Sequence, residues 1–331
     1  MSEKLLQLRE VSKVFRIGGL LLGKKIRAVD KVSLDIDARR PVILSIVGES
    51  GCGKTTLAKM ILRVHRADEG SILLGGQDYT DTRAYNPLRF RLDVQPIFQN
   101  PYESFSPRKP VDSYLFNTAL RLGISKTRKE AEALVDQTLR DVGLSLNAVK
   151  GKYNAQFSGG ELQRVSIARA LIARPKLIIA DEPVAAIDAS LKMNIVNLFK
   201  ELKDKYKVSF IYITHDLSTA YYISDYIATL YRGVLIEYGP AKAIMDDPAH
   251  PYTQLLMNAI PRVGDKWKED VSLPDMEDRE YLKLCCKFAD RCPLADERCR
   301  SQPPPMVELG GERRVLCFYP LVQKEEGFVH G

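Results

Sequence analysis

The stretch GESGCGKT at residues 48–55 is the strongest indication of the fold in this sequence. It lies between an apolar run at residues 42–47 and a helix-like stretch at residues 56–62, so it joins a strand to a helix. Glycines allow consecutive backbone N–H groups to close on an anion, and the N-terminus of the following helix presents partial positive charge. The sequence therefore predicts a phosphate-binding loop.

The side chains of this loop indicate which ligand it takes. Lys54 would reach the outer phosphates of a nucleotide, and the Thr55 hydroxyl would bind Mg²⁺. A glycine-rich turn with a fortuitous lysine is the alternative, but the flanking strand and helix are where a nucleotide loop needs them. Cys52 fits as a small loop residue, although a helix N-terminus could also lower the pKa of its thiol. The residues expected to surround the nucleotide are Gly48, Ser50, Gly51, Cys52, Gly53, Lys54, Thr55 and Thr56.

Length and composition indicate an ordinary folded protein with a large core. The chain has 331 residues, of which 45% are hydrophobic and 27% are charged. No apolar run approaches the ~20 residues that cross a bilayer, and the start Met-Ser-Glu-Lys lacks the plan of a secretory signal. We therefore expect a chain that is cytosolic or attached by partners. The net charge of +7 is dispersed, without the long basic run of a nucleic-acid-binding tail.

Strand and helix patterns alternate along the chain and predict an α/β nucleotide-binding domain. Half-buried strands are expected at residues 5–11 and 32–37, and buried parallel strands at 42–47, 177–180 and 208–213. Helices are expected at residues 131–142, 161–173 and 191–206. Thr127 and Glu130 predict a capping box before the first of these helices.

Changes in composition along the sequence also predict where the chain is divided into domains. Residues 1–240 form the nucleotide-binding domain in this prediction, with a mostly helical subdomain at about residues 101–165. Past about residue 240, proline-rich and charged stretches and a group of cysteines indicate a small C-terminal unit at residues 241–331. No internal repeat is present.

Two carboxylates follow the apolar run at residues 177–180. The ends of parallel strands are where an α/β sheet presents groups to a ligand. Asp181 is therefore a candidate Mg²⁺ partner, and Glu182 is suited to orienting and deprotonating a water molecule. A strand that simply leaves the core through two acids is the alternative.

The stretch FSGGELQR at residues 157–164 opens a helix with a turn of small residues, a second candidate anion site. In this order with the loop and the carboxylate pair, it resembles the signature of ABC-type ATPases. Gln99 in IFQNP resembles that family's Q-loop glutamine, Asp188 ends a D-loop-like segment, and His215 resembles its switch histidine. Phe15 resembles the aromatic residue that stacks on adenine, with core packing as its alternative.

The resemblance implies the fold of the P-loop ATPases and a mechanism that needs two chains. In that family two such domains form a head-to-tail sandwich, and each ATP lies between one chain's phosphate loop and the other chain's signature turn. The resemblance implies that Lys54 and the loop amides hold the β and γ phosphates and that Thr55, Asp181 and Gln99 surround Mg²⁺. Glu182 would act on the water, and His215 would contact the γ phosphate. Ser158 and Gly160 would serve the partner's nucleotide, and Gly159, Glu161 and Asp188 are also expected to bind nucleotide.

One segment departs from the family pattern. Residues 185–188 read AAID, where the family commonly has Ser-Ala-Leu-Asp, so a hydroxyl is lost at the seam between the two chains.

The C-terminal sequence narrows the resemblance. The stretch HPYT at residues 250–253, followed by a cysteine-rich tail, is similar to the ATPases of oligopeptide and dipeptide uptake systems, over almost the whole chain. The pairing of GCGK with IFQNP resembles the second of the two ATPase subunits of such systems. The implied partners are a homologous ATPase, two transmembrane permeases and, indirectly, a solute-binding protein, with no nucleic acid. The implied place is the cytoplasmic face of the membrane, and the solute is a peptide or an oligosaccharide.

Four cysteines of the tail have a spacing that some members of this family use to hold a [4Fe-4S] cluster: Cys286, Cys292, Cys299 and Cys317. Cys285 has no counterpart in that pattern. A zinc site is disfavoured because the tail has no Cys-x2-Cys pair, and reduced thiols without metal are a further alternative. Disulfides are not expected in a long chain in a reducing compartment.

Two other functions are weighed against an importer ATPase. A soluble ABC-type ATPase acting on nucleic acid or ribosomes usually carries two nucleotide domains or a coiled-coil insertion, whereas Lys54 and Ser158 are only 104 positions apart here, without heptads. The other alternative is an ATPase regulated by redox chemistry at a cysteine-bound cluster in the tail.

Overall fold

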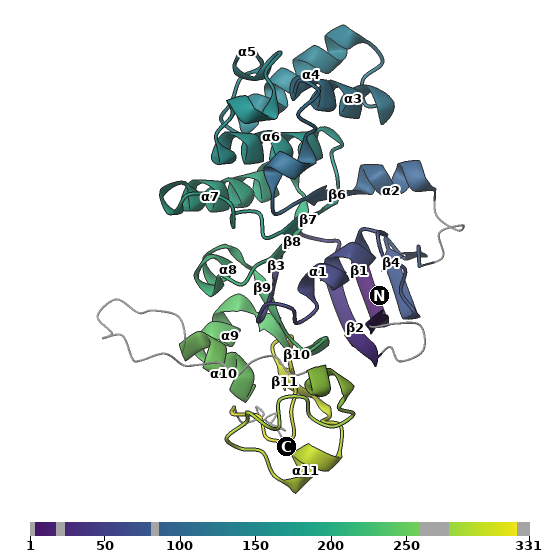
Figure 1. The fold of residues 1–331 in the computed structure, drawn as a ribbon, viewed down its shortest axis with the longest axis vertical. Coiled ribbons are helices and arrows are strands. Elements are labelled where there is room, and N and C mark those ends of the chain that lie inside the picture. Colours follow the sequence, from purple (N-terminus) through teal and green to yellow (C-terminus); the bar gives the residue numbers. More distant parts are fainter. Residues whose placement is uncertain (1–3, 18–23, 81–85, 259–277, 323–331) are drawn as a thin grey trace, which may run out of the picture.

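The computed structural model describes residues 4–17, 24–80, 86–258 and 278–322. These residues form two sheets with helices packed against them (Figure 1). The strands are β1 Lys4–Ile17, β2 Lys24–Asp37, β3 Ile43–Val47, β4 Glu69–Leu74, β5 Gln77–Asp78, β6 Val94–Ile97, β7 Leu177–Asp181, β8 Ser209–Ile213, β9 Tyr226–Tyr231, β10 Val234–Pro240, β11 Met306–Gly310 and β12 Arg313–Leu316. The helices are α1 Lys54–Ile61, α2 Pro87–Asp93, α3 Asp112–Arg121, α4 Arg128–Asp141, α5 Leu146–Val149, α6 Gly159–Ile172, α7 Ala189–Tyr206, α8 Leu217–Ile223, α9 Ala241–Asp246, α10 Pro251–Asn258 and α11 Glu297–Ser301, with 3-10 turns at Pro101–Ser104, Asn154–Gln156 and Asp278–Leu282.

The larger sheet has the strand order β11-β12-β10-β9-β3-β8-β7-β6. Strand β3 pairs in parallel with β8 and β9, and β7 pairs in parallel with β8 and β6. All residues of β3 and β8 are buried. Parallel strands covered on both faces read as continuous apolar runs, which is why their sequences predicted them correctly.

The smaller sheet is antiparallel, in the order β2-β1-β4-β5. Strands β1 and β2 confirm the two predicted half-buried strands, although each is longer than predicted, at 14 residues. Figure 1 shows α1 beside this sheet. Apolar side chains of α1, of β1 and β2, and of the central strands share one core, so the phosphate loop before α1 is anchored on both sheets.

Helices cover the other face of the larger sheet. Between β6 and β7, a stretch that the structure describes completely, the only regular elements are helices and 3-10 turns. Helices α3, α4, α6 and α7 share a second core with side chains from β3, β7 and β8. The domain boundaries proposed from the sequence stay a prediction. Among the described residues, no helix combines the length and the apolar character needed to cross a bilayer.

The start of α4 confirms half of the predicted capping box. The Thr127 hydroxyl accepts a hydrogen bond from the Glu130 backbone N–H at 3.2 Å. The Glu130 carboxylate, however, accepts from the backbone N–H of Lys126 at 2.8 Å and leaves Thr127 aside. The cap is present, and the reciprocal bond is displaced by one residue.

The C-terminal residues include two strands that join the larger sheet. Strand β12 pairs antiparallel with β10, and β11 pairs with β12, so residues 306–316 extend the larger sheet. The edge of β10 would otherwise leave backbone groups unpaired, which explains why the tail binds there. The buried Glu237 carboxylate of β10 also accepts hydrogen bonds from the backbone N–H groups of Ala249 and His250, at 2.8 and 3.0 Å, just before α10.

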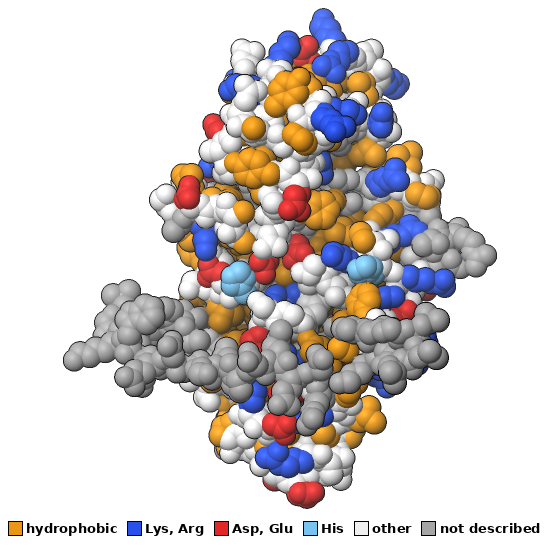
Figure 2. Space-filling model, viewed as in Figure 1, with side chains coloured by type: hydrophobic (Ala, Val, Ile, Leu, Met, Phe, Trp, Pro, Cys, Tyr) orange, Lys and Arg blue, Asp and Glu red, His pale blue; other side chains and the backbone are white. Residues whose placement is uncertain are grey.

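Charged side chains are dispersed over the face of the molecule that Figure 2 shows. Figure 2 shows Lys and Arg side chains over the whole visible face, with a group at the end formed by α3, α4 and α5. This distribution fits the small net charge of +7.

Candidate functional site

The loop between β3 and α1 follows a path that only glycine permits at two positions. Gly48 has φ +147° and Gly53 has φ +108°. A Cβ atom at Gly48 would lie 2.2 Å from the carbonyl oxygen of Leu230, and one at Gly53 would lie 2.2 Å from that of Ala28. The backbone of Leu230 and of Ala28 therefore packs directly against the loop and leaves no space for a side chain at these two positions.

Lys54 begins α1, and its ammonium group lies within the curl of the loop. The side chain is buried, and its Nζ donates to the carbonyl oxygens of Gly48 at 2.7 Å and Glu49 at 2.8 Å. The next residue, Thr55, donates from Oγ1 to Oδ1 of Asp181 at 3.3 Å. The loop is thereby joined to the carboxyl end of β7, where the predicted carboxylate pair begins.

The two carboxylates at the end of β7 differ in their surroundings. Burial raises the pKa of Asp181 and the nearby Glu182 charge adds to this, whereas the Thr55 hydrogen bond opposes it. A bound cation would favour the charged form instead. Glu182 has a left-handed backbone, with φ +46°, and its N–H donates to the Ile213 carbonyl oxygen at 2.8 Å. A non-glycine residue in this conformation costs about 1 kcal/mol or more of backbone strain, which the surrounding structure has to offset.

Gln99 and His215 flank the Glu182 carboxylate. Nε2 of Gln99 donates to one carboxylate oxygen at 3.1 Å, and Nδ1 of His215 lies 3.1 Å from the other. The three residues follow β6, β7 and β8, which are adjacent parallel strands whose carboxyl ends meet at one edge of the sheet. The structure thus brings together three residues that are far apart in sequence and that we assigned to catalysis.

The turn before α6 forms the N-terminal cap that its sequence indicates. The Ser158 hydroxyl accepts from the Glu161 N–H at 3.2 Å, and the Glu161 carboxylate accepts from the Ser158 N–H at 2.9 Å. The Ser158 N–H and the Ser158 hydroxyl both donate to this carboxylate and lower the pKa of Glu161. A Cβ atom on Gly159 would lie 3.3 Å from the Ala186 carbonyl oxygen, so the turn packs closely on the segment that precedes the exposed Asp188.

This turn stands apart from the phosphate loop of the same chain. Within the described residues, no hydrogen bond joins Ser158, Gly159 or Gly160 to residues 48–55. Figure 1 likewise places α6 among the helices beyond the sheet, away from α1. A role in a second chain's nucleotide site stays a prediction.

Two further predictions concern Phe15 and Cys52. The half-buried Phe15 ring makes an edge contact with His65, at 5.5 Å between ring centres, and stacking on adenine stays a prediction. Cys52 is 1% exposed, and burial raises the pKa of its thiol. This burial opposes the lowering of the thiol pKa that a helix N-terminus could produce, and desolvation outweighs the nearby Lys54 charge.

The four cysteines with cluster spacing line one small cavity, together with His250 and Phe288. Burial raises the pKa of both Cys286 and Cys317 to about 11, so the thiols are protonated where no cation faces them. All six cysteines of the chain lie in the described residues and are free thiols there. As placed, however, no three or more Cys, His, Asp or Glu side chains in the described part of the chain form a group that could hold a metal ion.

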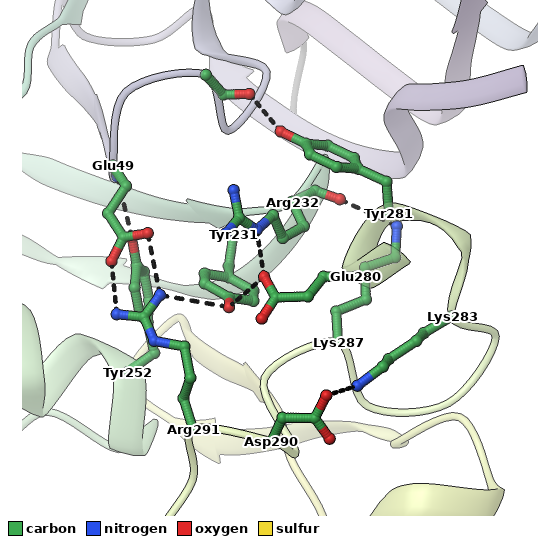
Figure 3. Close-up of polar contacts among 11 residues, drawn as sticks. Glu49, Tyr231, Arg232, Tyr252, Glu280, Tyr281, Lys283, Lys287, Asp290 and Arg291 are labelled. Atoms are coloured by element: carbon green, nitrogen blue, oxygen red, sulfur yellow. Dashed lines mark hydrogen bonds and ion pairs between the residues drawn. The ribbon is translucent and has the colours of Figure 1, made fainter. Parts of the chain in front are cut away.

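C-terminal residues make contacts with the phosphate loop that were not predicted from the sequence (Figure 3). Arg291 pairs with Glu49, Tyr281 donates to the Gly51 carbonyl oxygen, and the Tyr252 hydroxyl accepts from the Glu49 N–H. Arg291 and Glu49 are 242 positions apart, and no local pattern signals such a pair.

Comparisons with known proteins agree with this architecture. The family described as "ABC transporter" matches residues 29–185, and that described as "Oligopeptide/dipeptide transporter, C-terminal region" matches residues 236–299. The di/tripeptide transport ATP-binding protein DppF of Pseudomonas aeruginosa is 34% identical, over 96% of this chain and 98% of its own. The oligopeptide transport ATP-binding protein AppF of Bacillus subtilis is 37% identical, over 95% and 97%.

Solved structures show the same fold. CbiO1 of Clostridium perfringens, part of an ABC transporter complex, superposes with a TM-score of 0.62 at 22% identity, covering 74% of this chain and 91% of its own. A bacterial ABC transporter cassette with a dimeric structure gives 0.60 at 26% identity, covering 71% and 98%. The chain is thus an ATPase that belongs to the ATP-binding subunits of the oligopeptide and dipeptide ABC transporter family.

Proposed function

We propose that this chain binds ATP with Mg²⁺ on the loop around Lys54 and hydrolyses it to power peptide import, with a second ATPase chain completing each site. The observation that carries this proposal is the position of Glu182. Its carboxylate lies between Gln99 and His215, beside the Thr55–Asp181 hydrogen bond that reaches the loop.

Binding of the nucleotide falls to the loop and its neighbours. The ammonium of Lys54 and the loop N–H groups hold the β and γ phosphates, as the curl of the loop around Lys54 allows. Thr55, Asp181 and Gln99 hold Mg²⁺, which neutralises charge that develops on the phosphate oxygens. The partly buried Asp181, whose pKa is raised by desolvation, is suited to pairing with a cation.

Hydrolysis falls to Glu182 and the two residues beside it. Glu182 accepts a proton from the attacking water, because its carboxylate is fixed in place by two side chains and by a strained backbone. His215 contacts the γ phosphate, and its exposed ring leaves room for this. Gln99, which donates to the Glu182 carboxylate, would also supply an oxygen ligand to Mg²⁺.

The Glu182→Gln substitution tests this assignment. Assembled with its partner ATPase and permeases, the variant should bind ATP as the unmodified chain does and hydrolyse it about 100-fold or more slowly, because an amide cannot accept the proton. Glu201→Gln, an exposed residue of α7, is the matched control and should hydrolyse normally. Undiminished hydrolysis by Glu182→Gln would remove Glu182 from this role.

In the proposed assembly, two ATPase chains on the cytoplasmic face of the membrane bind two transmembrane permeases. Ser158 and Gly160 serve the nucleotide on the partner's loop, with Gly159, Glu161 and Asp188 near it. The permeases dock on the helical region, where Phe98 and Tyr102 are 43% and 40% exposed beside Gln99. In this proposal residues 1–240 form the nucleotide-binding domain, with the helical subdomain at about residues 101–165.

The proposed solute is a peptide. The relatives named above are peptide transport proteins, and their similarity covers nearly the whole chain. Neither an oligosaccharide cargo nor action on nucleic acid receives support from the comparisons. Binding of short peptides by the solute-binding protein of the same system tests the cargo separately from the ATPase.

The cysteine cavity remains a proposed site for a [4Fe-4S] cluster. Its support is that the four thiols line one cavity, since four thiolates are the donor set that such a cluster needs. Their placement would have to tighten, because as they lie they do not form a metal-binding group. Iron and sulfide analysis after anaerobic purification decides between a cluster and bare thiols, and transport by Cys292→Ser decides whether the site regulates the ATPase.

A further inference from the structure

We propose that Arg291 and Tyr281, at the C-terminal end of the chain, are positioning residues of the phosphate loop, so that residues 278–291 form part of the ATP site. This inference rests on the proposed function in one respect, which is that residues 48–55 bind ATP. Figure 3 shows both side chains reaching the loop from the C-terminal segment.

Arg291 forms a bidentate ion pair with Glu49 through both terminal nitrogens of its guanidinium group. Nη2 donates to Oε1 at 2.9 Å and Nη1 donates to Oε2 at 3.1 Å. The side chains are only 10% and 13% exposed, so water screens the pair weakly. A two-pronged bond of this kind fixes the direction as well as the distance of its acceptor, which a lysine could not do.

Two tyrosines hold the loop backbone on either side of Ser50. The hydroxyl of Tyr252 accepts from the Glu49 N–H at 3.0 Å, and the hydroxyl of Tyr281 donates to the Gly51 carbonyl oxygen. Together with the Arg291 pair, three contacts fix the Glu49–Gly51 part of the loop. These contacts reach the loop from residues outside β3 and α1, the two elements that the loop joins.

The Arg291 pair also removes an unfavourable charge. Glu49 places a carboxylate in a loop that has to receive anionic phosphates, and an unpaired carboxylate there would repel them. Its carbonyl oxygen accepts a hydrogen bond from Lys54 Nζ at 2.8 Å. A shift of Glu49 would therefore also move the ammonium group that the phosphates need.

The C-terminal segment is itself firmly anchored. Glu280 pairs with the buried Arg232 at 2.6 Å, and Lys287 pairs with Asp30 at 2.9 Å. The Phe288 ring packs on the rings of Tyr231 and Tyr252, with ring centres 5.3 and 5.4 Å apart. The segment can therefore act as a rigid support, since its side chains are fixed by buried ion pairs and aromatic contacts.

The test measures MgATP affinity of the full chain by calorimetry. Arg291→Met should weaken binding by about tenfold, within the range that coupling between neighbouring sites produces. Arg300→Met is the matched control, because this half-exposed arginine of the nearby helix α11 pairs with the exposed Asp290, so the variant should bind ATP normally. Tyr281→Phe, which loses one hydroxyl only, should weaken binding by about threefold.

A second substitution separates a positioning role from a merely structural one. Glu49→Gln combined with Arg291→Met removes the unpaired carboxylate, so the double variant should bind ATP more tightly than Arg291→Met alone. Arg291→Lys keeps the charge and loses the fork, and its affinity should fall between those of the unmodified chain and Arg291→Met. Melting temperatures of all variants accompany the affinities.

Unchanged ATP affinity in Arg291→Met and Tyr281→Phe would overturn the inference. So would a double variant that binds no better than Arg291→Met, because the effect would then not pass through Glu49. Failure of the unmodified chain to bind MgATP, or unchanged binding in Lys54→Ala, would instead contradict the proposed function.

Discussion

Gly53 illustrates how single residues decide the shape of the phosphate loop. Its φ of +108° is open to glycine and strained for other residues, and the Ala28 carbonyl oxygen fills the space where a side chain would start. The sequence motif predicted a glycine here from the need for close backbone approach to phosphate. The structure adds a second reason, which is the close approach of β2.

The Gly53→Ala substitution should lower the free energy of unfolding by more than about 3 kcal/mol, because backbone strain and a clash add to each other. Gly75→Ala is the control, since Gly75 also has a left-handed backbone, with φ +55°, but open space around it. That change should cost about 1 kcal/mol. Urea unfolding of both variants measures the difference, and equal costs would show that the contact with Ala28 is unimportant.

Asp141 connects two elements, the end of α4 and the end of α7. Its carboxylate accepts from Lys205 Nζ at 2.7 Å and from the Tyr206 hydroxyl at 2.5 Å. Burial alone would raise the pKa of Asp141, but these hydrogen bonds outweigh it and hold the pKa below its usual value. The charged carboxylate therefore stabilises the packing of the helical region on α7.

Asp141→Asn should lower the free energy of unfolding at pH 7 by about 1–2 kcal/mol, the usual effect of hydrogen bonds to a charged group. Because the folded pKa lies below the unfolded one, this stabilisation is complete above about pH 4 and is lost as the pH falls through the folded pKa. The difference between the two proteins should therefore shrink below about pH 4 in urea unfolding. Asp204→Asn, an exposed position of α7, should change little at either pH.

Only some of the elements were readable from the sequence, and β4, β6, β9 and β10 were not among the predicted strands. Continuous apolar runs gave β3, β7 and β8, and small-residue and hydroxyl caps gave the starts of α4 and α6. The pairing of β12 with β10 was not readable, because the short strand Arg313–Leu316 carries polar side chains and its partner lies far back in the chain. Edge pairing depends on backbone groups, which every sequence supplies alike.

At the scale of the whole molecule, the separation of the Ser158 turn from the Lys54 loop suggests that two chains share each ATP. The prediction combines two changes in the assembled complex. With Glu182→Gln blocking this chain's own site, the hydrolysis that remains belongs to the partner's loop. Adding Ser158→Ala should then lower it by about tenfold or more, because the donor facing the partner's phosphates is lost.

Ser145→Ala provides the control, since Ser145 caps the short helix α5 with a similar hydrogen bond and lies in the same helical region. It should leave the remaining hydrolysis unchanged. MgATP binding by the isolated Ser158→Ala chain should also stay normal, because its own loop is intact. Unaltered hydrolysis in the complex would contradict the shared site.

Four features could be predicted from the sequence alone, because each depends on residues that are adjacent in the chain: the phosphate loop, the carboxylate pair, the signature turn and the family. Local spacing fixes such motifs through backbone geometry and helix caps. Two sets of contacts are visible only in the folded structure. Gln99 and His215 flank Glu182, and Arg291 and Tyr281 contact the phosphate loop. Those contacts depend on the strand order and on the position of the C-terminal segment beside the loop. Each contact needs only one charged group or hydroxyl at a distant position, so it leaves no local pattern in the sequence.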